Sequence, residues 1–135
     1  MNFEQAVLQL TALLEHNKFR FHPVFVMELQ KLLKTALNGH ESDFFRRLIK
    51  LLEQLDRNGK DIIRIDGHEL LSHSRSTLYS LHVQTKYINL RLIISFIGET
   101  PVFLACFNEK SGKKRTGYQN YIQAAEDRLK DMKEE

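Results

Sequence analysis

The sequence predicts an α+β fold with N-terminal helices, a small antiparallel β-sheet meander and a C-terminal helix. In the first 55 residues, apolar side chains recur every three or four positions, which is the spacing of amphipathic helices. Between residues 78 and 107 this spacing gives way to alternating and β-branched runs, which are typical of strands. Strands placed between two helical blocks indicate an α+β domain. At 135 residues, the chain is expected to form a single domain.

The first helix is predicted over residues 3–14, where the apolar positions follow the helical spacing. A stop is expected at His16 and Asn17. Residues 19–22 alternate in polarity and end before Pro23, so they are expected to form at most a short strand or an extended link.

Two more helices are predicted before residue 60. The first is expected over residues 24–37, and the second from residue 41 or 42 through Leu55. An Asn-Gly pair follows each of them, at residues 38–39 and 58–59. Glycine in the left-handed conformation is a common way to end a helix, so both boundaries are expected to be sharp.

Three strands are predicted, over residues 78–84, 88–97 and 101–107. Residues 98–100 are expected to join the last two as a hairpin. The dense apolar content of these two strands indicates that helices cover them. A polar, basic loop is expected over residues 108–117, and the last helix from Tyr118 or Asn120 to about Lys133.

Several classes of protein are made improbable by what the sequence lacks. Cys106 is the only cysteine, so no internal disulfide can form, and its apolar neighbours predict a buried thiol. The N-terminus lacks the pattern of a signal peptide, and no run approaches the about 18 apolar residues of a membrane span. A cytoplasmic protein without membrane contact is expected. The histidines share no metal-ligand spacing and no Walker or dinucleotide motif occurs, so no metal or cofactor is expected.

The positive charge is concentrated in one part of the chain. Residues 1–56 are balanced, with seven basic and seven acidic residues. Residues 57–121 hold ten basic residues against five acidic ones, whereas residues 122–135 are slightly acidic. A localised basic excess favours an anionic partner, and phosphate backbones are the commonest such partner. A solvated surface with a few additional lysines is the alternative interpretation.

A polar face is predicted on the first strand of the meander. Ser80, His82 and Gln84 share one face because side chains alternate along a strand. The next strand carries Arg91 within the apolar run 90–94, where an unpaired charge is costly to bury. Its guanidinium is therefore expected to reach a sheet edge, an incoming phosphate or a carboxylate.

If Arg91 has a structural role only, Glu69 and Glu99 are its candidate partners. The following loop gathers four cations in six positions and precedes Tyr118 and Tyr121. Beside an exposed sheet face, these residues predict a phosphate clamp with aromatic stacking partners. The RNA-binding candidates are Lys86, Lys110, Lys113, Lys114, Arg115 and Tyr118.

RNA can be cleaved without a metal when the 2′-hydroxyl is the nucleophile. The reaction needs a proton acceptor, a cation that stabilises the phosphorane, and an acid for the leaving oxygen. His82, Arg91 and a lysine or Arg115 can fill these roles, with Tyr121 as an alternative acid or a stacking platform. The candidate catalytic residues are therefore His82, Arg91 and Tyr121.

These residues lie in a pattern that resembles the RelE/ParE toxin superfamily, including the HigB-like toxins of bacterial type II toxin–antitoxin modules. The similar stretch runs from Asp43 to about Lys130, which makes residues 43–130 a RelE/ParE-like core and residues 1–42 a helical N-terminal extension. The resemblance rests on the order of short motifs: Asn58-Gly59 after a helix, strands at 78–83, 89–94 and 102–107, the basic loop, and a last helix with Tyr121, Ala124 and Arg128.

The resemblance implies a concave sheet face that binds RNA in the ribosomal A site. RelE-type and HigB-type members cut mRNA there, whereas ParE-type members poison DNA gyrase. Arg91 matches the strand arginine of the cleaving members, Tyr121 matches a tyrosine early in their last helix, and residues 110–115 match their basic loop. A cognate antitoxin is the implied partner, in a toxin–antitoxin hetero-oligomer.

This chain departs from the family pattern in two places. Ser80 and His82 stand where some cleaving members have lysines, so either His82 takes over proton transfer or cleavage is weakened. Residues 1–42 exceed the minimal fold, and they are expected to cover the sheet or to bind the antitoxin.

The sequence leaves more than one function open. The leading hypothesis is a ribosome-dependent mRNA endoribonuclease that a cognate antitoxin neutralises. The alternatives are a non-catalytic protein of the same fold, such as a gyrase inhibitor or a phage-derived regulatory binding protein, and a simple interaction domain. The nuclease hypothesis requires His82, Arg91 and Tyr121 to converge on one open cleft. It also requires that an internal ion pair does not hold the guanidinium of Arg91.

Overall fold

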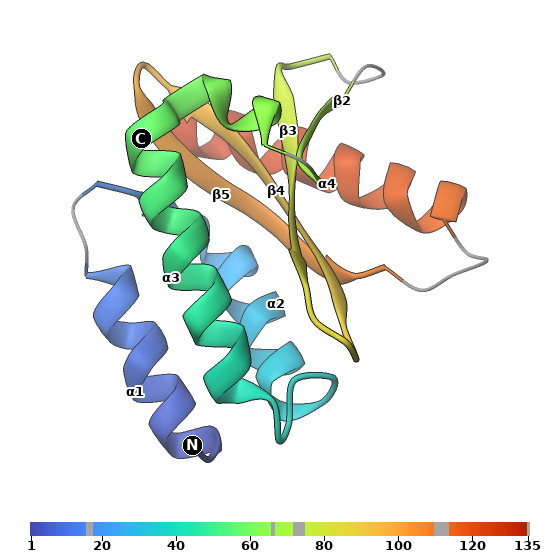
Figure 1. Cartoon of the computed structure of the whole chain (residues 1–135). Helices are drawn as coiled ribbons and strands as arrows, with labels where there is room; N and C mark the ends of the chain where they lie inside the picture. Colours follow the sequence, from blue (N-terminus) through green and yellow to red (C-terminus); the bar gives the residue numbers. More distant parts are fainter. Residues whose placement is uncertain (16–17, 66, 72–74, 110–113, 135) are drawn as a thin grey trace.

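The structure is a computed structural model that describes residues 1–15, 18–65, 67–71, 75–109 and 114–134, with the backbone only for residues 114–117. The chain folds into the predicted α+β class, with helices before and after one sheet (Figure 1). Its elements are α1 (Phe3–Leu14), β1 (Arg20–Phe21), α2 (Pro23–Lys34), α3 (Glu41–Asn58), a 3-10 helix η1 (Gly59–Arg64), β2 (Glu69–Leu71), β3 (Leu78–Gln84), β4 (Asn89–Ile97), β5 (Thr100–Asn108) and α4 (Lys114–Lys133).

The five strands form one mixed sheet in the order β1-β5-β4-β3-β2. The pairs from β2 to β5 are antiparallel, as a meander requires. β1 is parallel to β5, with Phe21 opposite Phe103, so the predicted antiparallel meander is confirmed and one short parallel strand at its edge makes the sheet mixed. β1 and β2 contain two and three residues, which is too short for alternation to reveal a strand, and β2 was not predicted.

The last helix begins earlier than its sequence predicts. α4 starts at Lys114, inside the segment predicted to be a loop up to Gly117. Lys114 and Arg115 therefore belong to a helix rather than to the predicted loop. Polarity was the reason for predicting a loop, but lysine and arginine are good helix formers, so a polar run does not by itself exclude a helix.

Helices cover both faces of the sheet (Figure 1). α2 and α3 lie on one face with α1 packed against both of them, and α4 lies on the other. The strand side chains alternate accordingly: Leu81, Val83, Leu90 and Leu92 are buried with the N-terminal helices, and Leu78, Ile93 and Ala105 with α4. Among the described helices, none combines the length and apolarity needed to cross a bilayer.

The N-terminal extension shares the main core with the sheet. The ring of Phe103 in β5 lies 6.1 Å from that of Phe19, 4.9 Å from that of Phe21 and 5.5 Å from that of Phe25. Phe25 and Phe103 are fully buried. Residues 1–42 therefore supply part of the core of this fold.

Where β5 extends past its short pairing with β1, the Glu28–Arg128 ion pair binds the backbone groups of its edge. Glu28 of α2 accepts the backbone N–H of Cys106 at 3.1 Å, and Arg128 of α4 donates to the carbonyl oxygen of Leu104 at 2.8 Å. Arg128 also donates to Glu28 at 2.8 Å. Cys106 is itself buried, as predicted, and burial raises the pKa of its thiol.

Candidate functional site

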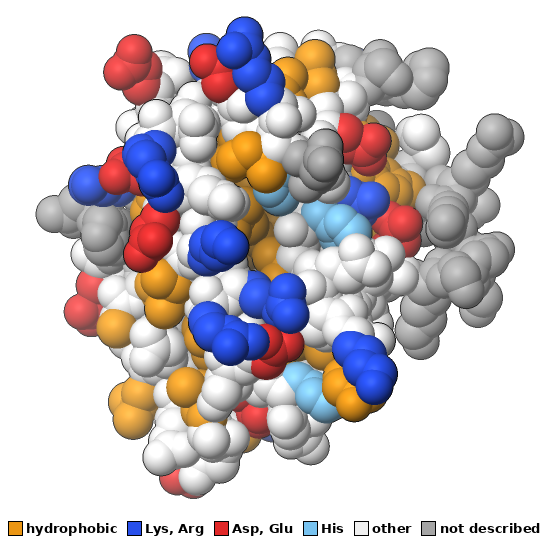
Figure 2. All heavy atoms as spheres, in the orientation of Figure 1, with side chains coloured by type: hydrophobic (Ala, Val, Ile, Leu, Met, Phe, Trp, Pro, Cys, Tyr) orange, Lys and Arg blue, Asp and Glu red, His pale blue; other side chains and the backbone are white. Residues whose placement is uncertain are grey.

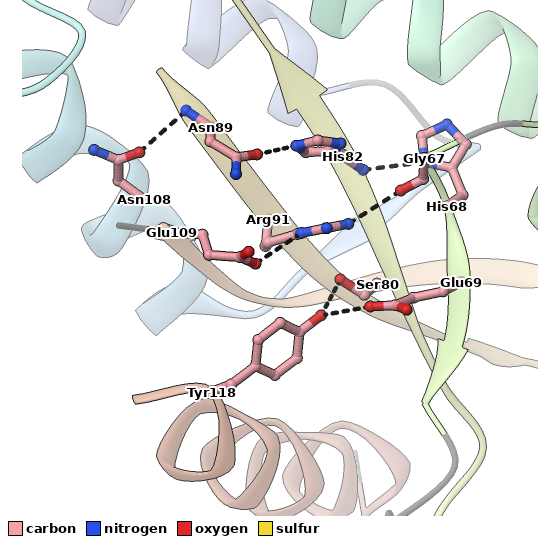
Figure 3. Close-up of polar contacts among 10 residues, drawn as sticks. All are labelled: Gly67, His68, Glu69, Ser80, His82, Asn89, Arg91, Asn108, Glu109 and Tyr118. Carbon is pink, nitrogen blue, oxygen red and sulfur yellow. Dashed lines mark hydrogen bonds and ion pairs between the residues drawn. The ribbon is translucent and has the colours of Figure 1, made fainter. Parts of the chain in front are cut away.

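A row of polar side chains crosses the face of the sheet on which α4 lies. Ser80 and His82 of β3 share this face, and Arg91 of β4 pairs with His82 across the strands. Glu109, which follows β5, accepts a hydrogen bond from Arg91, and the hydroxyl of Tyr118 in α4 is hydrogen-bonded to Ser80. We call these five residues the polar row; Figure 3 shows them with their neighbours.

Arg91 is held on two sides. Its Nε donates to Glu109 Oε2 at 3.0 Å, and its Nη1 donates to the carbonyl oxygen of Gly67 at 3.0 Å (Figure 3). The side chains of Arg91 and Glu109 are only 15% and 11% exposed. The partners expected for a structural arginine, Glu69 and Glu99, are wrong, because the β4–β5 register places Asn108 opposite Leu90 and so brings Glu109 beside Arg91.

This ion pair counts against the nuclease hypothesis, which requires a guanidinium free of internal pairing. It does not use all the donors of Arg91, however. A guanidinium has five N–H donors, and these bonds use one at Nε and one at Nη1. Among the described residues Nη2 has no hydrogen-bond partner, so Arg91 is a positioned cation that can still donate to a phosphate oxygen.

His82 lies between two polar partners. Its Nε2 is hydrogen-bonded to Oδ1 of Asn89, and its backbone N–H donates to Nδ1 of His68 at 3.0 Å (Figure 3). Burial, followed by the charge of Arg91, lowers the pKa of His82. Burial, followed by His82 and Arg91, lowers the pKa of His68. Both imidazoles are therefore biased toward the neutral form, in which a ring nitrogen can accept a proton.

Tyr118 closes the other end of the polar row. Its hydroxyl is hydrogen-bonded to Ser80 Oγ and lies 3.3 Å from Glu69 Oε1 (Figure 3). Its ring packs edge-on against Phe107, with the centroids 5.2 Å apart. Burial raises the pKa of Tyr118 to about 12, although the bond to Ser80 opposes the shift. Tyr118 therefore stays protonated and acts as a donor near neutral pH.

Tyr121 does not join His82 and Arg91, so the convergence that the nuclease hypothesis requires of these three residues is not met, which counts in favour of the non-catalytic alternative. Its ring stacks flat on Phe107 at 4.2 Å and 9°. Burial, followed by the charge of Glu28, raises the pKa of the Tyr121 hydroxyl. Residues three apart share a helix face but differ in height by about 4.5 Å. Tyr118 lies one such step nearer the start of α4 than Tyr121, and its hydroxyl is the one that meets Ser80 of the polar row.

The predicted RNA-binding cations are only partly described. Lys110 and Lys113 lie outside the described residues, as do the side chains of Lys114 and Arg115. Lys86 lies at the β3–β4 turn, where its Nζ is 5.8 Å from the ring centroid of Tyr87.

The turn that carries Lys86 presents an aromatic surface. Tyr87 is 67% exposed and stacks on His40 with the ring centroids 4.7 Å apart. This turn lies beyond the pair of Gln84 and Asn89, away from the part of the polar row that contains Ser80 and Tyr118.

A cleft of about 450 Å³ separates α3 from β3 beside the two histidines. His68 and His82 line one wall, and Arg47 and Lys50 of α3 line the other. Figure 2 shows this face, with basic side chains along α3, histidines beside them and apolar side chains between. Arg47 is partly neutralised by Asp43 at 3.2 Å. The cleft therefore offers a cationic approach to His82.

Sequence reasoning missed several residues of this site. No sequence pattern indicates His68 or Asn89, and the cations of α3 lie in a stretch of balanced charge. Arg47 and Lys50 do have the spacing of one helix face, but solvated helices show the same spacing, so this signal is weak. His68 directly precedes β2 and His82 lies in β3, so their contact joins two separate segments and no local pattern encodes it.

The described residues offer no group of three or more His, Cys, Asp or Glu side chains that could hold a metal ion. The polar row itself provides a paired guanidinium, an imidazole, a carboxylate and two hydroxyls, and His68 and Glu69 add a second imidazole and a second carboxylate beside it.

The lowered pKa values of His68 and His82 predict a loss of stability in weak acid. The ordinary pKa of a histidine is 6.5, and folding lowers the pKa of both residues below it. Between the folded-state pKa values and 6.5 the unfolded chain binds more protons, so the free energy of unfolding should fall as the pH decreases through this interval. Below the folded-state values this contribution levels off.

Urea unfolding between about pH 7.5 and about pH 5 measures this dependence. A His68→Gln/His82→Gln variant should lose most of the slope in that interval. A wild-type curve that is flat there would show that neither imidazole is desolvated on folding.

Comparisons with known proteins do not assign the chain to a family. No protein-family model, curated protein or solved structure matches it. The resemblance to RelE/ParE toxins therefore rests on the sequence motifs, and the site must be interpreted from its own geometry.

Proposed function

We propose that this chain is a RelE/ParE-type toxin that cuts mRNA on the ribosome without a metal and is neutralised by a cognate antitoxin. The observation that supports this proposal most directly is the polar row, in which Arg91, His82 and Tyr118 occupy one sheet face. They provide a fixed cation, a largely neutral imidazole and a protonated hydroxyl. These are the groups that cleavage through a 2′-hydroxyl needs.

In the proposed reaction His82 is the general base. If its Nε2 donates to Asn89 Oδ1, Nδ1 is the nitrogen that accepts the 2′-hydroxyl proton. Nδ1 lies beside Gly67, where a Cβ atom would come within 3.4 Å of it. A glycine at this position keeps the approach to Nδ1 open.

Arg91 and Tyr118 have the other two roles. As the 2′-oxygen attacks phosphorus, negative charge develops on the non-bridging oxygens, and Nη2 of Arg91 can donate to one of them. The bond to the 5′-oxygen then breaks, and the hydroxyl of Tyr118 protonates this leaving group. Tyr118 replaces Tyr121 in this mechanism because it is the tyrosine that contacts Ser80.

A second function is favoured by the Arg91–Glu109 ion pair. An arginine that is 15% exposed and bonded on two sides also suits a structural role beneath a non-catalytic binding surface. In that case the chain would be a gyrase-inhibiting toxin or a regulatory binding protein of the same fold. The cations of the α3 cleft would then contact the partner, and no bond would be broken.

Induction of the chain in a bacterial host, with primer extension on translated messages, separates these functions. Growth arrest with cuts in phase with codons is the expected result. Arrest accompanied by DNA damage would favour gyrase inhibition instead. If the folded protein accumulates without arrest and without cuts, the chain is not a toxin in that host and the proposal fails.

A further inference from the structure

A second polar pocket, of about 410 Å³, lies at the end of the sheet where β3 begins and β4 ends. Its walls come from η1, the segment before β3, the last residues of β4 and the end of α4. It shares no lining residue with the cleft between α3 and β3, and it contains no member of the polar row.

The pocket is lined by three cations and by no carboxylate among the described residues. Lys60, Arg75 and Lys133 come from three separate elements and meet here. Lys60 rests over the ring of Phe96 with its Nζ 5.9 Å from the centroid. Within the described part of the chain, none of these three side chains forms an ion pair. Their charges are therefore available to an anion.

Hydrogen bonds hold the wall that carries Arg75. The backbone N–H of Arg75 donates to Glu126 Oε1 of α4 at 2.6 Å. Ser95 Oγ donates to the carbonyl oxygen of Thr77 at 2.7 Å. The segment before β3 is thus tied both to β4 and to α4, which fixes the position of the pocket wall.

Tyr79 supplies a hydroxyl for which the described part of the chain offers no hydrogen-bond partner. The residue is 5% exposed, and its ring packs edge-on against Phe96 at 5.3 Å. Among the described residues its hydroxyl has no hydrogen-bond partner. Every side-chain N or O atom there that is sealed from solvent does have a partner, so this hydroxyl is not sealed from solvent. The hydroxyl therefore opens into the pocket that Tyr79 lines. A ligand oxygen would satisfy it.

We propose that this pocket is a phosphate-binding site. Three cations without counter-charges favour an anion with more than one negative charge, and a buried hydroxyl donor adds a directed hydrogen bond to one of its oxygens. The volume lies in the range of small-ligand sites and exceeds what a single phosphate needs. The phosphate can belong to a mononucleotide or to the backbone of an RNA strand. This inference does not depend on the proposed nuclease activity.

NMR titrations of the full chain test the proposal with three probes at constant ionic strength. These are inorganic phosphate, a nucleoside 5′-monophosphate and a short RNA without terminal phosphates. Phosphate should shift the backbone amides of Lys60, residues 75–79 and Lys133. Preference for the monophosphate would identify a free nucleotide as the ligand, whereas preference for the RNA would identify the backbone.

Two variants assign the binding to the pocket. Lys133→Gln should weaken binding about tenfold, because a charge-assisted hydrogen bond is lost. Tyr79→Phe should weaken it about threefold to tenfold with an unchanged melting temperature, since no described residue forms a hydrogen bond with the hydroxyl. If the Tyr79 hydroxyl had only a structural role, its removal would not weaken phosphate binding while leaving the melting temperature unchanged.

Lys130→Gln is the matched control, because Lys130 is on the same helix, is exposed and does not line the pocket. It should leave the affinity within about twofold of the wild type. Equal weakening by Lys130→Gln and Lys133→Gln would show nonspecific attraction and overturn the proposal. So would phosphate-induced shifts confined to other parts of the chain.

Discussion

Replacing Arg91 by alanine should lower the rate of mRNA cleavage by at least about 100-fold, because a preorganised donor to the charge that develops in the transition state is lost. The rate is measured as the appearance of cut message in a purified translation system. In the proposed mechanism the reaction then lacks a cation near phosphorus, whereas His82 and Tyr118 remain. Substrate binding should change less than the rate, since the cations of the α3 cleft are untouched.

The ion pair with Glu109 complicates this experiment and also supplies its control. Arg91→Ala leaves a carboxylate that is only 11% exposed without its partner, which destabilises a fold independently of chemistry. The Arg91→Ala/Glu109→Ala double variant removes both charges, so it should recover stability and stay inactive. The Glu109→Ala variant keeps the guanidinium and should retain cleavage.

Arg64→Ala is a matched surface control. Arg64 has a side chain that is 82% exposed, with a carboxylate 3.8 Å away on its own short helix. The cleavage rate should change by less than about twofold, as expected for a weak surface pair. Wild-type cleavage by a folded Arg91→Ala/Glu109→Ala variant would remove Arg91 from the mechanism and favour the non-catalytic function.

Replacing Phe103 by alanine should lower the free energy of unfolding by about 3 to 5 kcal/mol, the usual cost of removing a large buried ring. Phe103 is fully buried and contacts three other phenylalanine rings of the N-terminal segment, the nearest being Phe21 at 4.9 Å. The cavity would open where β1 and α2 meet β5. Urea unfolding monitored by circular dichroism measures the loss.

A matched control for this variant is Leu8→Ala, because Leu8 is 71% exposed on α1. It should change the free energy of unfolding by less than about 0.5 kcal/mol. The Phe103 result also tests the part that residues 1–42 have in the fold. If residues 1–42 formed a separable extension, Phe103→Ala would lower the free energy of unfolding by less than about 1 kcal/mol, since the ring would bury little surface against them.

The elements that local periodicity encodes were predicted well. β3 occupies the predicted residues 78–84, and α3 begins at Glu41 as expected. α3 has seven buried positions on one stripe, and an 18-residue amphipathic pattern is hard to mistake. β1 and β2 carry no such pattern, because two or three residues span less than two periods of alternation.

The candidate site was predicted less completely than the fold. The two-residue period predicts the shared face of Ser80 and His82, but the pairing of His82 with Arg91 depends on the register of β3 with β4, which the sequence does not specify. The partner of Arg91 was not predicted, since Glu109 reaches it only through the register of β4 with β5. Tyr118 and Tyr121 share a helix face, so the spacing alone could not decide between them.

The sequence by itself determined the helices, the long strands and the polar side chains that these strands carry, because each depends on residues that are close together in the sequence. Tertiary structure alone decided which of these side chains meet. Glu109 beside Arg91, His68 beside His82 and Lys60 beside Lys133 join segments that are 14 to 73 residues apart. Such contacts depend on sheet register and on the docking of α4, which are set by burial of the whole core rather than by any local pattern.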